Sequence, residues 1–410
     1  MGYPAASARA FQYGLGIFIL TALLGLANAT QVFGALDRNA LLTHLHSGTL
    51  GWITMGVIGL TIWMFGGQRD MTMIVRISAL ATAAYVLAFW SGNFQARAIF
   101  GLAMLGVVYG WWWFVVSRGM LEGWGSFDTA KLSVLFGLTT LVIGSTLGVI
   151  VQVILGTGNN VPTTPDLVGA HASAQVGGYL VLVAAGFIEW RLTGGGRRTA
   201  AGIAQVALLF VGGLLLSVSL LLAAQLPAQA QQALPGIATL FTLLGTLIVV
   251  VRLGRSALGV SWISGGQRHV AIALGYLVAG VVMFAILVQQ FIAAQGDPSA
   301  VSVGLLHAVD HTYFVGLSTN VLFGAIFIFS EARPRAWPWA DNVIFWGLNI
   351  GAAGFIATLL IAGSGEGAKA FTHPVSFIAP IMGLSALLGI VTLEMRLSNA
   401  PVAVRAPSPA

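Results

Sequence analysis

Five of the seven histidines lie close to one end of three strongly apolar segments. His44 and His46 belong to HLHSGTLGW, His171 belongs to GAHASAQVGGY, and His307 and His311 belong to HAVDHTYFVG. Ionisable side chains are costly at membrane depth, so they are candidates for function by default. Neutral imidazoles bind haem iron, copper and other divalent ions. The first hypothesis for these residues is therefore a haem or metal site.

The spacing of these histidines predicts which of them can act together. His44 and His46 are two residues apart, which turns them by about 200° on a regular helix, so they should face different compartments. His307 and His311 are four residues apart and share one helix face, where they share a site or occupy two levels of one cavity. Asp310 beside them either orients a ligand or faces the aqueous surface.

The composition requires elements that cross a membrane. With 57% hydrophobic residues, 7% charged residues and a mean hydropathy of +0.91 over 410 residues, the chain is not an ordinary soluble protein. An apolar helix of about 20 residues spans a bilayer, and such runs recur along the whole length. We expect an all-α integral membrane protein with twelve spans at 10–35, 43–66, 72–91, 97–117, 131–156, 167–190, 200–224, 234–253, 268–293, 304–330, 341–364 and 372–395.

The basic residues predict the orientation of these spans. If the N-terminus is cytoplasmic, 15 of the 18 Lys and Arg residues fall on the cytoplasmic side, and only Arg38, Arg97 and Lys369 fall outside. Both termini are therefore expected in the cytoplasm of a bacterium, with the protein in its inner (plasma) membrane. The net charge of +6 then reflects topology, and no basic run suggests nucleic acid. Residues 1–396 should form one domain, followed by a disordered cytoplasmic tail at 397–410.

The three histidine-bearing segments show a weak internal repeat. When Gly51, Gly178 and Gly316 are aligned, a second glycine follows eight residues later in each segment, His44 coincides with His171, and His46 coincides with His311. The segments are four spans apart, which predicts three pseudo-repeated arcs of four helices at about 1–125, 126–260 and 261–396. The glycines also fit close helix contact, and His171 alone also fits a hydrogen bond to a neighbouring helix.

The segment HLHSGTLGW at 44–52 resembles the haem-ligating segment of the C-family haem-copper oxidases, whose motif reads H-x-H-S-G-x-L-G-W. The main subunit of that superfamily has twelve helices in three arcs of four, with metal ligands near the outer surface on helices 2, 6, 7 and 10. The resemblance implies that His44 faces a high-spin or active site and that His46 binds a low-spin haem.

The chain also departs from that family. The motif lies on the second span instead of the tenth, the seventh span lacks the paired histidines that bind copper, and Gln175 stands where a tyrosine follows the histidine of the sixth span. A complete copper centre is not expected. The resemblance is instead to a divergent relative, similar to the nitric oxide reductases or to the haem-containing membrane proteins of nitric oxide metabolism called NnrS. The absence of cysteine excludes disulfides, iron–sulfur clusters and covalently attached haem.

These observations lead to one leading hypothesis. His46 and His311 hold a low-spin haem b, and His44, His171 and His307 form a second site for another haem or for copper or iron. Such a protein passes electrons or binds and reduces nitric oxide or oxygen, so oxidoreductase activity is open. A c-type cytochrome or a quinol is the implied electron donor, with membrane lipid and other respiratory subunits as further partners. The alternatives are a twelve-helix secondary transporter and a non-catalytic haem subunit of a respiratory complex.

The two remaining histidines and three glutamates carry separate expectations. His269 follows GGQR and is expected to be a solvated residue at the cytoplasmic interface. Glu189, Glu331 and Glu394 lie at helix ends and are expected to pair with the nearby Arg191, Arg333 and Arg396, respectively. No ladder of carboxylates crosses the membrane, so a redox proton pump is not supported. The role of His373 stays open between a ligand, a propionate contact and an interfacial residue.

Overall fold

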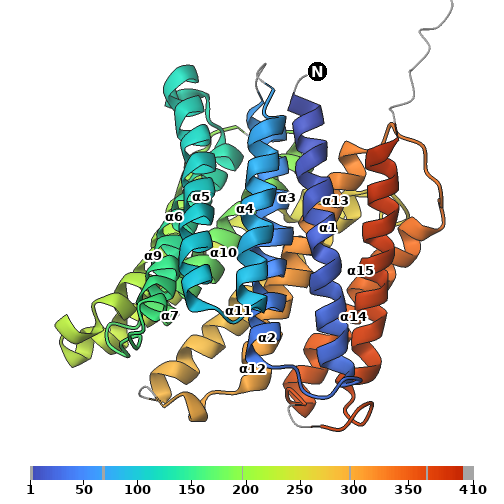
Figure 1. Cartoon of the computed structure of the whole chain (residues 1–410). Coiled ribbons are helices and arrows are strands. Elements are labelled where there is room, and N and C mark those ends of the chain that lie inside the picture. Colours follow the sequence, from blue (N-terminus) through green and yellow to red (C-terminus); the bar gives the residue numbers. More distant parts are fainter. Residues whose placement is uncertain (1–2, 67–69, 196, 295–296, 366–367, 400–410) are drawn as a thin grey trace, which may run out of the picture.

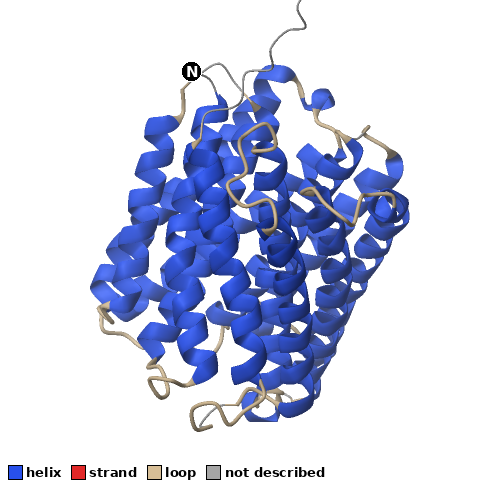
Figure 2. Ribbon diagram, turned by 90° about the vertical axis from the view of Figure 1, so that its right-hand side faces the viewer, coloured by secondary structure: helices blue, strands red, loops and turns tan. Residues whose placement is uncertain are grey.

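The described part of the chain is helical throughout. The computed structural model describes residues 3–66, 70–195, 197–294, 297–365 and 368–399, and these ranges contain no strand. Within them, twelve helices are long and apolar enough to cross a membrane, which confirms the expected all-α fold (Figures 1 and 2). Most of the tail expected beyond residue 396 lies outside the described residues.

Nine of the twelve spans are continuous α-helices in the described ranges. They are α1 (Tyr3–Thr30), α4 (Thr72–Trp90), α5 (Phe94–Glu122), α6 (Thr129–Gly156), α9 (Ala200–Leu221), α10 (Ala228–Leu258), α11 (Gln267–Ala293), α14 (Ala340–Ala362) and α15 (Val375–Ser398). The first span begins at residue 3 instead of 10, because its small and polar first residues also adopt helix. Short 3₁₀ turns, η2 (Trp124–Ser126), η4 (Ala223–Gln225) and η5 (Pro298–Ala300), lie in the connections.

The remaining three spans, the second, sixth and tenth, each contain a π-helical segment and are called the inner spans here. Span 2 is α2 (Arg38–His46), η1 (Ser47–Thr54) and α3 (Met55–Phe65). Span 6 is α7 (Leu167–Ser173), η3 (Ala174–Leu180) and α8 (Val181–Thr193). Span 10 is α12 (Val303–His311), η6 (Thr312–Thr319) and α13 (Asn320–Phe329). Buried residues make up 83%, 61% and 78% of their apolar windows, so these three spans form much of the core.

The other nine spans surround the inner spans in a closed ring. Each inner span contacts the span after it, through α2 with α4, α7 with α9, and α12 with α14. The ring continues through the pairs α4–α5, α9–α10 and α14–α15, and successive arcs meet at α5–α6, α10–α11 and α15–α1. Each of these types of contact therefore occurs three times, four spans apart. This is the contact pattern of three equivalent four-helix arcs.

The π segments repeat at the same register as the glycines. Each begins four residues before the aligned glycine, at 47, 174 and 312 for Gly51, Gly178 and Gly316. Inserted π turns are uncommon and frequently lie at functional sites. The three π segments begin at equivalent positions, directly after the histidines or within one turn of them. This correspondence supports the threefold repeat.

Hydrogen bonds between the π segments follow the same symmetry. Trp52, one residue after its aligned glycine, donates its indole N–H to Thr319 Oγ1 at 2.9 Å, and Tyr179 at the equivalent position donates its hydroxyl to Thr54 Oγ1 at 3.2 Å. Thr54 and Thr319 each donate in turn to the carbonyl five residues earlier, at 2.9 and 2.8 Å. Leu317, the residue after the aligned glycine of span 10, is apolar and cannot donate the equivalent hydrogen bond. Two of the three inner-span interfaces are therefore polar at this level.

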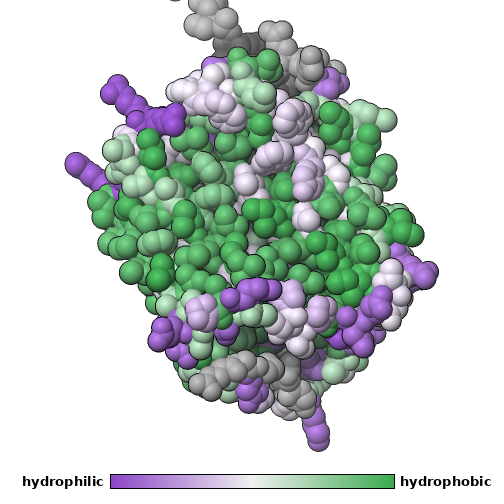
Figure 3. Space-filling model, turned by 90° about the vertical axis from the view of Figure 1, so that its left-hand side faces the viewer, coloured by the Kyte–Doolittle hydropathy of each residue, from purple (hydrophilic) through white to green (hydrophobic). Residues whose placement is uncertain are grey.

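The surface is arranged for a bilayer. Figure 3 shows a broad apolar zone between two ends where hydrophilic side chains gather. In Figure 1, α1 begins and α15 ends at the same end of the bundle, and α2, α7 and α12 lie at the other, called the histidine end here. Helices α2, α7 and α12 are each capped at the N-terminus by a side chain that accepts a hydrogen bond from the backbone N–H three residues later. The capping residues are Asp37, Asp166 and Ser302.

The expected ion pairs do not form within the described residues. Glu189 is buried and pairs with Arg252 at 2.5 Å, while Arg191 lies over the rings of Trp63 and Trp190. The side chain of Arg333 donates to carbonyl groups at the end of α15, Arg396 pairs with Asp341, and Glu394 accepts from Gln12. For Glu189 and Glu394 the expectation was wrong because residues two apart on a helix point about 200° from each other and cannot meet. Glu331 and Arg333 lie in the turn after α13, where the Arg333 side chain reaches the end of α15 instead.

The interfacial assignment of His269 was also wrong. His269 is 1% exposed, donates Nδ1–H to Asn320 Oδ1 at 2.8 Å, and stacks on Phe327. Its Nε2 atom is buried with no hydrogen-bond partner in the described structure. The helix α11 packs tightly on α13 through Gly266 and Gly324, which places the third residue of α11 inside the bundle and not at its surface.

Candidate functional site

His44 and His171 occupy equivalent positions and make the same hydrogen bond. Each lies seven residues before its aligned glycine. His44 Nδ1 donates to the carbonyl of Thr21 in α1 at 2.9 Å, and His171 Nδ1 donates to the carbonyl of Gly144 in α6 at 2.7 Å. A carbonyl can only accept, so both neutral rings carry their proton on Nδ1 and keep the lone pair on Nε2.

A glycine one helical turn further along α1 and α6 makes room for each ring. Gly25 follows Thr21 by four residues, and Gly148 follows Gly144 by four. A Cβ atom at Gly25 would lie 2.8 Å from the ring of His44, and one at Gly148 would lie 2.8 Å from the ring of His171. Both imidazoles therefore lie directly on the backbone of the preceding span.

His46 and His311 form a second equivalent pair, five residues before their aligned glycines. Each donates Nδ1–H at 2.8 Å to the carbonyl four residues earlier in its own helix, that of Leu42 or His307. Each ring also contacts a phenylalanine of the following span. His46 stacks on Phe89 of α4 with centroids 3.7 Å apart, and His311 lies 4.6 Å from Phe355 of α14. These rings also keep Nε2 as the free acceptor.

These contacts place the four histidines in two of three sectors of the ring. The first sector lies between spans 2 and 6 and is bounded by α4, α5 and α6. The third lies between spans 10 and 2 and is bounded by α14, α15 and α1. His46 contacts α4 and His171 contacts α6, so both belong to the first sector. His44 contacts α1 and His311 contacts α14, so both belong to the third.

Electrostatic proximity gives the same grouping. His46 interacts with His171, and His311 interacts with His44 and with His307. His44 and His46 thus face different sectors, in agreement with their two-residue spacing. The sequence hypothesis grouped His46 with His311, whereas here the ring of His46 contacts α4 and the ring of His311 contacts α14.

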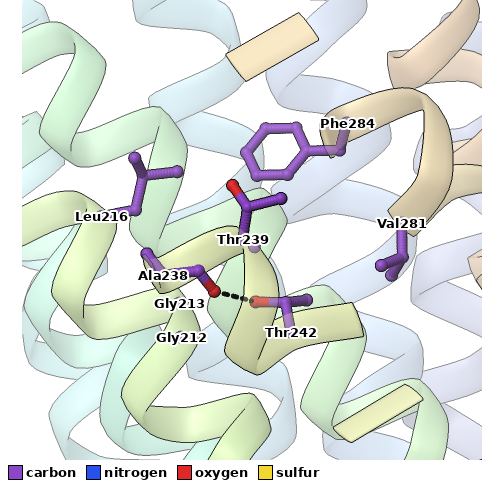
Figure 4. A pocket seen from close by; sticks show the side chains of 9 residues that line it. Gly212, Gly213, Leu216, Ala238, Thr239, Thr242, Val281 and Phe284 are labelled. Atoms are coloured by element: carbon purple, nitrogen blue, oxygen red, sulfur yellow. Dashed lines mark hydrogen bonds between the residues drawn. The ribbon is translucent and has the colours of Figure 1, made fainter. Parts of the chain in front are cut away.

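The second sector, between spans 6 and 10, lacks histidines at the equivalent positions. Ser173 lies five residues before Gly178, and Val309 lies seven before Gly316. Here α9 packs on η3 so closely that a Cβ at Gly213 would lie 2.6 Å from the Cα of Gly178. The remaining cavity measures about 10 Å³ and is lined by apolar and small residues of η3, α9, α10 and α11 (Figure 4). It has room for about one water molecule, not for a cofactor.

The described histidines could supply only a small number of ligands to any one metal ion. All five histidines are only partly buried, in contrast to the enclosed His269, so space adjoins their rings. Within the described ranges, no group of three or more His, Cys, Asp or Glu side chains is arranged to hold a metal ion. Two imidazoles from different spans that each leave Nε2 unbonded would be suitable ligands for a haem iron.

The remaining candidates lie around these pairs. The carbonyl of His307 orients His311, and Asp310 lies partly buried between the two. His373 lies near the end of α14, with its Nε2 3.2 Å from the carbonyl of Ala362, and its ring contacts Gly365. Gln175, at the position of the family tyrosine, donates to Ser145 Oγ at 3.3 Å.

Sequence reasoning did not identify Arg97 as part of the site. It was assigned to an external connection, but it lies in the first turn of α5, is 2% exposed, and interacts electrostatically with His46. Its guanidinium carbon lies 4.8 Å from the centroid of Phe89, the ring on which His46 stacks. The only signal in the sequence is an arginine at the first position of the expected fourth span.

The fold and these pairs define the class of protein: a polytopic membrane protein with twelve helices, two equivalent histidine pairs and no third pair in the described structure. Comparisons with protein-family models and with curated proteins find no match. The function is therefore argued from the residues themselves.

Proposed function

We propose that this protein is an integral membrane haem protein that binds two b-type haems, one in the first sector and one in the third. His46 and His171 are the ligands in the first sector, and His44 and His311 are the ligands in the third. The observation that carries the proposal is the shared state of the four imidazoles. Each directs Nδ1–H to a backbone carbonyl and keeps Nε2 for a ligand.

The hydrogen bonds from Nδ1 to backbone carbonyls support this proposal. Histidines that bind metals almost always donate their other ring N–H to a carbonyl or carboxylate, which sets the tautomer and the ring orientation. The bonds of His46 and His311 are to carbonyls of their own helices, so these two rings do not serve to join helices through Nδ1. Gly25 and Gly148 add to the argument, because they allow His44 and His171 to lie against a backbone.

Haem would supply one-electron chemistry and a coordination site for a diatomic gas. The protein contributes position and environment. The first sector has two histidines that are each held by a carbonyl, which favours a six-coordinate haem for electron transfer. The third sector has in addition His307 and Asp310 next to His311, and nitric oxide or oxygen would bind to its haem only when His44 or His311 leaves the iron. The resemblance to nitric oxide reductases implies reduction of such a gas, and we place this reaction in the third sector.

The side of the membrane follows from the charge distribution. Placing the histidine end on the outer face of a bacterial inner membrane puts 15 of 18 basic residues on the cytoplasmic side. A c-type cytochrome on the outer face or a quinol in the bilayer would then be the donor of electrons. We propose this electron donor and other respiratory subunits as partners of the protein.

The test is spectroscopic and compares four single variants. The protein is purified in detergent after expression with ample haem supply, and reduced-minus-oxidised spectra are recorded with and without carbon monoxide or nitric oxide. Haem content is measured as the pyridine haemochrome. We expect about two haems per chain in the wild type, and about one in each of His46→Ala, His171→Ala, His44→Ala and His311→Ala.

The pattern of loss distinguishes this pairing from others. His46→Ala and His171→Ala should remove one spectral component, and His44→Ala and His311→Ala should remove the other. If His46→Ala and His311→Ala removed the same component, the pairing expected from sequence would replace the one proposed. A wild-type protein without haem or metal would contradict the haem function and favour a twelve-helix transporter. His373→Ala, outside both pairs, is the control and should keep both components.

A further inference from the structure

A buried cation without a counter-ion lies in the first sector. Arg97 is 2% exposed, yet it forms no ion pair within the described residues. Arg38, a permanently charged group with which Arg97 interacts electrostatically, is another cation. Burial of an unpaired charge is unfavourable, and buried charges in proteins are generally paired or bound to a ligand. Arg97 is therefore suited to bind an anion.

The hydrogen bonds of Arg97 leave one side of the guanidinium unused. Nη2 donates to Asn39 Oδ1 at 2.8 Å and to the carbonyl of Phe89 at 2.9 Å, and Nε donates to the carbonyl of Ala88 at 3.4 Å. Nη1 has no acceptor among the described residues. Four contacts from α2 and α4 thus hold the group in place before any anion arrives, counting the ring of Phe89.

The position of Arg97 links this charge to the histidine pair. The ring of Phe89 contacts both the guanidinium, at 4.8 Å, and the imidazole of His46, at 3.7 Å. Asn39 lies in α2 together with His46. Residues 92–95, immediately before Arg97, line an open depression of about 820 Å³ at the histidine end. A ligand held by His46 therefore has its polar edge within reach of Arg97 when that edge faces this end.

We infer that Arg97 is a carboxylate-binding residue that pairs with a propionate of the haem in the first sector and raises the midpoint potential of that haem relative to the haem in the third. The inference rests on the proposed function. Arginine is suited to carboxylates because its planar fork donates two parallel hydrogen bonds. A fixed positive charge near a haem favours the reduced state, which carries one positive charge less.

The threefold repeat explains why the effect is confined to one sector. Helices α5, α10 and α15 are equivalent, and Arg97 is the fourth residue of α5. The fourth residues of α10 and α15 are Gln231 and Ile378, which carry no charge. Electrons should therefore reside first on the haem of His46 and His171.

The experiment is an anaerobic redox titration of the full-length protein, followed by optical absorbance, together with the haem content per chain. Arg97→Gln is compared with Arg38→Gln, which removes an exposed cation that interacts with Arg97. In Arg97→Gln we expect the component that His46→Ala removes to shift to a lower potential and to lose haem more readily. The other component should not move. Arg38→Gln should leave both components close to their wild-type potentials.

A second variant keeps the test valid if Arg97→Gln does not fold. Asn39→Asp places a carboxylate where an amide oxygen now lies 2.8 Å from Nη2, so it competes with the propionate for Arg97 and adds negative charge. It should lower the same component. Arg97→Lys, which keeps the charge but not the fork, should fall between Arg97→Gln and the wild type. Unchanged potentials and haem content in both Arg97→Gln and Asn39→Asp would overturn this inference while leaving the haem function intact. A colourless wild type would contradict both.

Discussion

Trp52 and Thr319 join spans 2 and 10 through one hydrogen bond of 2.9 Å, from the indole N–H to the hydroxyl oxygen. The bond lies between two π segments, η1 and η6, one turn or more beyond the histidines of the third sector. Tyr179 and Thr54 repeat it between spans 6 and 2. These two bonds set the distances between the inner spans, and thus between histidines that belong to different spans.

A double-mutant cycle on this pair tests its contribution to stability. Trp52→Phe and Thr319→Val should each lower the stability of the detergent-solubilised protein. Their coupling free energy should be about 0.6 kcal/mol, the average for hydrogen bonds between helices in membranes. Thermal unfolding of the two single variants and the double variant measures it. Strictly additive effects would show that the bond adds no stability of its own.

The glycines beside the histidines provide a second prediction. Gly25→Ala places a Cβ 2.8 Å from the ring of His44, so the ring must move and its Nε2 leaves the third sector. We expect loss of the haem component that also depends on His311, measured by the pyridine haemochrome and the reduced spectrum. Gly16→Ala in the same helix is the matched control, since a Cβ there meets nothing within 4 Å. Equal spectra for the two variants would argue against a role for Gly25.

The buried ion pair at the opposite end predicts an asymmetric response to mutation. Glu189 is fully buried and paired with Arg252 at 2.5 Å, so Arg252→Met leaves an uncompensated carboxylate and should cost about 3–5 kcal/mol. The double variant Glu189→Gln/Arg252→Met should recover most of this loss. Arg118→Ala breaks the more exposed pair with Glu122 and should cost less than about 1 kcal/mol. Unfolding in detergent by a chemical denaturant provides the comparison, and a harmless Arg252→Met would contradict it.

His269 provides a test of a histidine that is not a ligand. His269→Leu removes the hydrogen bond to Asn320 and also the buried Nε2 that has no partner, so the two effects oppose each other. We expect a change in stability of no more than about 1 kcal/mol and unchanged haem spectra, in contrast to the four sector histidines. Any loss of haem in His269→Leu would mean that the half of span 10 away from the histidine end controls the site.

The lack of native cysteine makes the orientation directly testable. Asn159→Cys lies in the exposed connection between α6 and α7 at the histidine end, and Ser264→Cys lies in the exposed connection between α10 and α11 at the other end. A membrane-impermeant maleimide should label Asn159→Cys in intact bacteria and Ser264→Cys only after permeabilisation. The reverse pattern would place the histidine pairs on the cytoplasmic side.

Much of the fold was predictable because it depends on local composition. Eleven of the twelve expected spans begin within about six residues of the observed helices, since burying an apolar run in lipid forces its backbone to satisfy its own hydrogen bonds. The separation of His44 from His46 was predictable for the same local reason, because two residues on a helix turn by about 200°. The equivalence of His44 with His171, and of His46 with His311, was visible from the glycine register.

The sequence by itself determined the twelve spans, their helical state and the positions of the histidines along them. Only the tertiary structure decided which histidines share a sector, that Arg97 lies beside His46, and that Glu189 pairs with Arg252 instead of Arg191. Hydropathy is a property of each segment alone, whereas these partnerships depend on which spans are neighbours in the ring. The ring closes through α1 and α15, at opposite ends of the chain, and no local pattern encodes that contact.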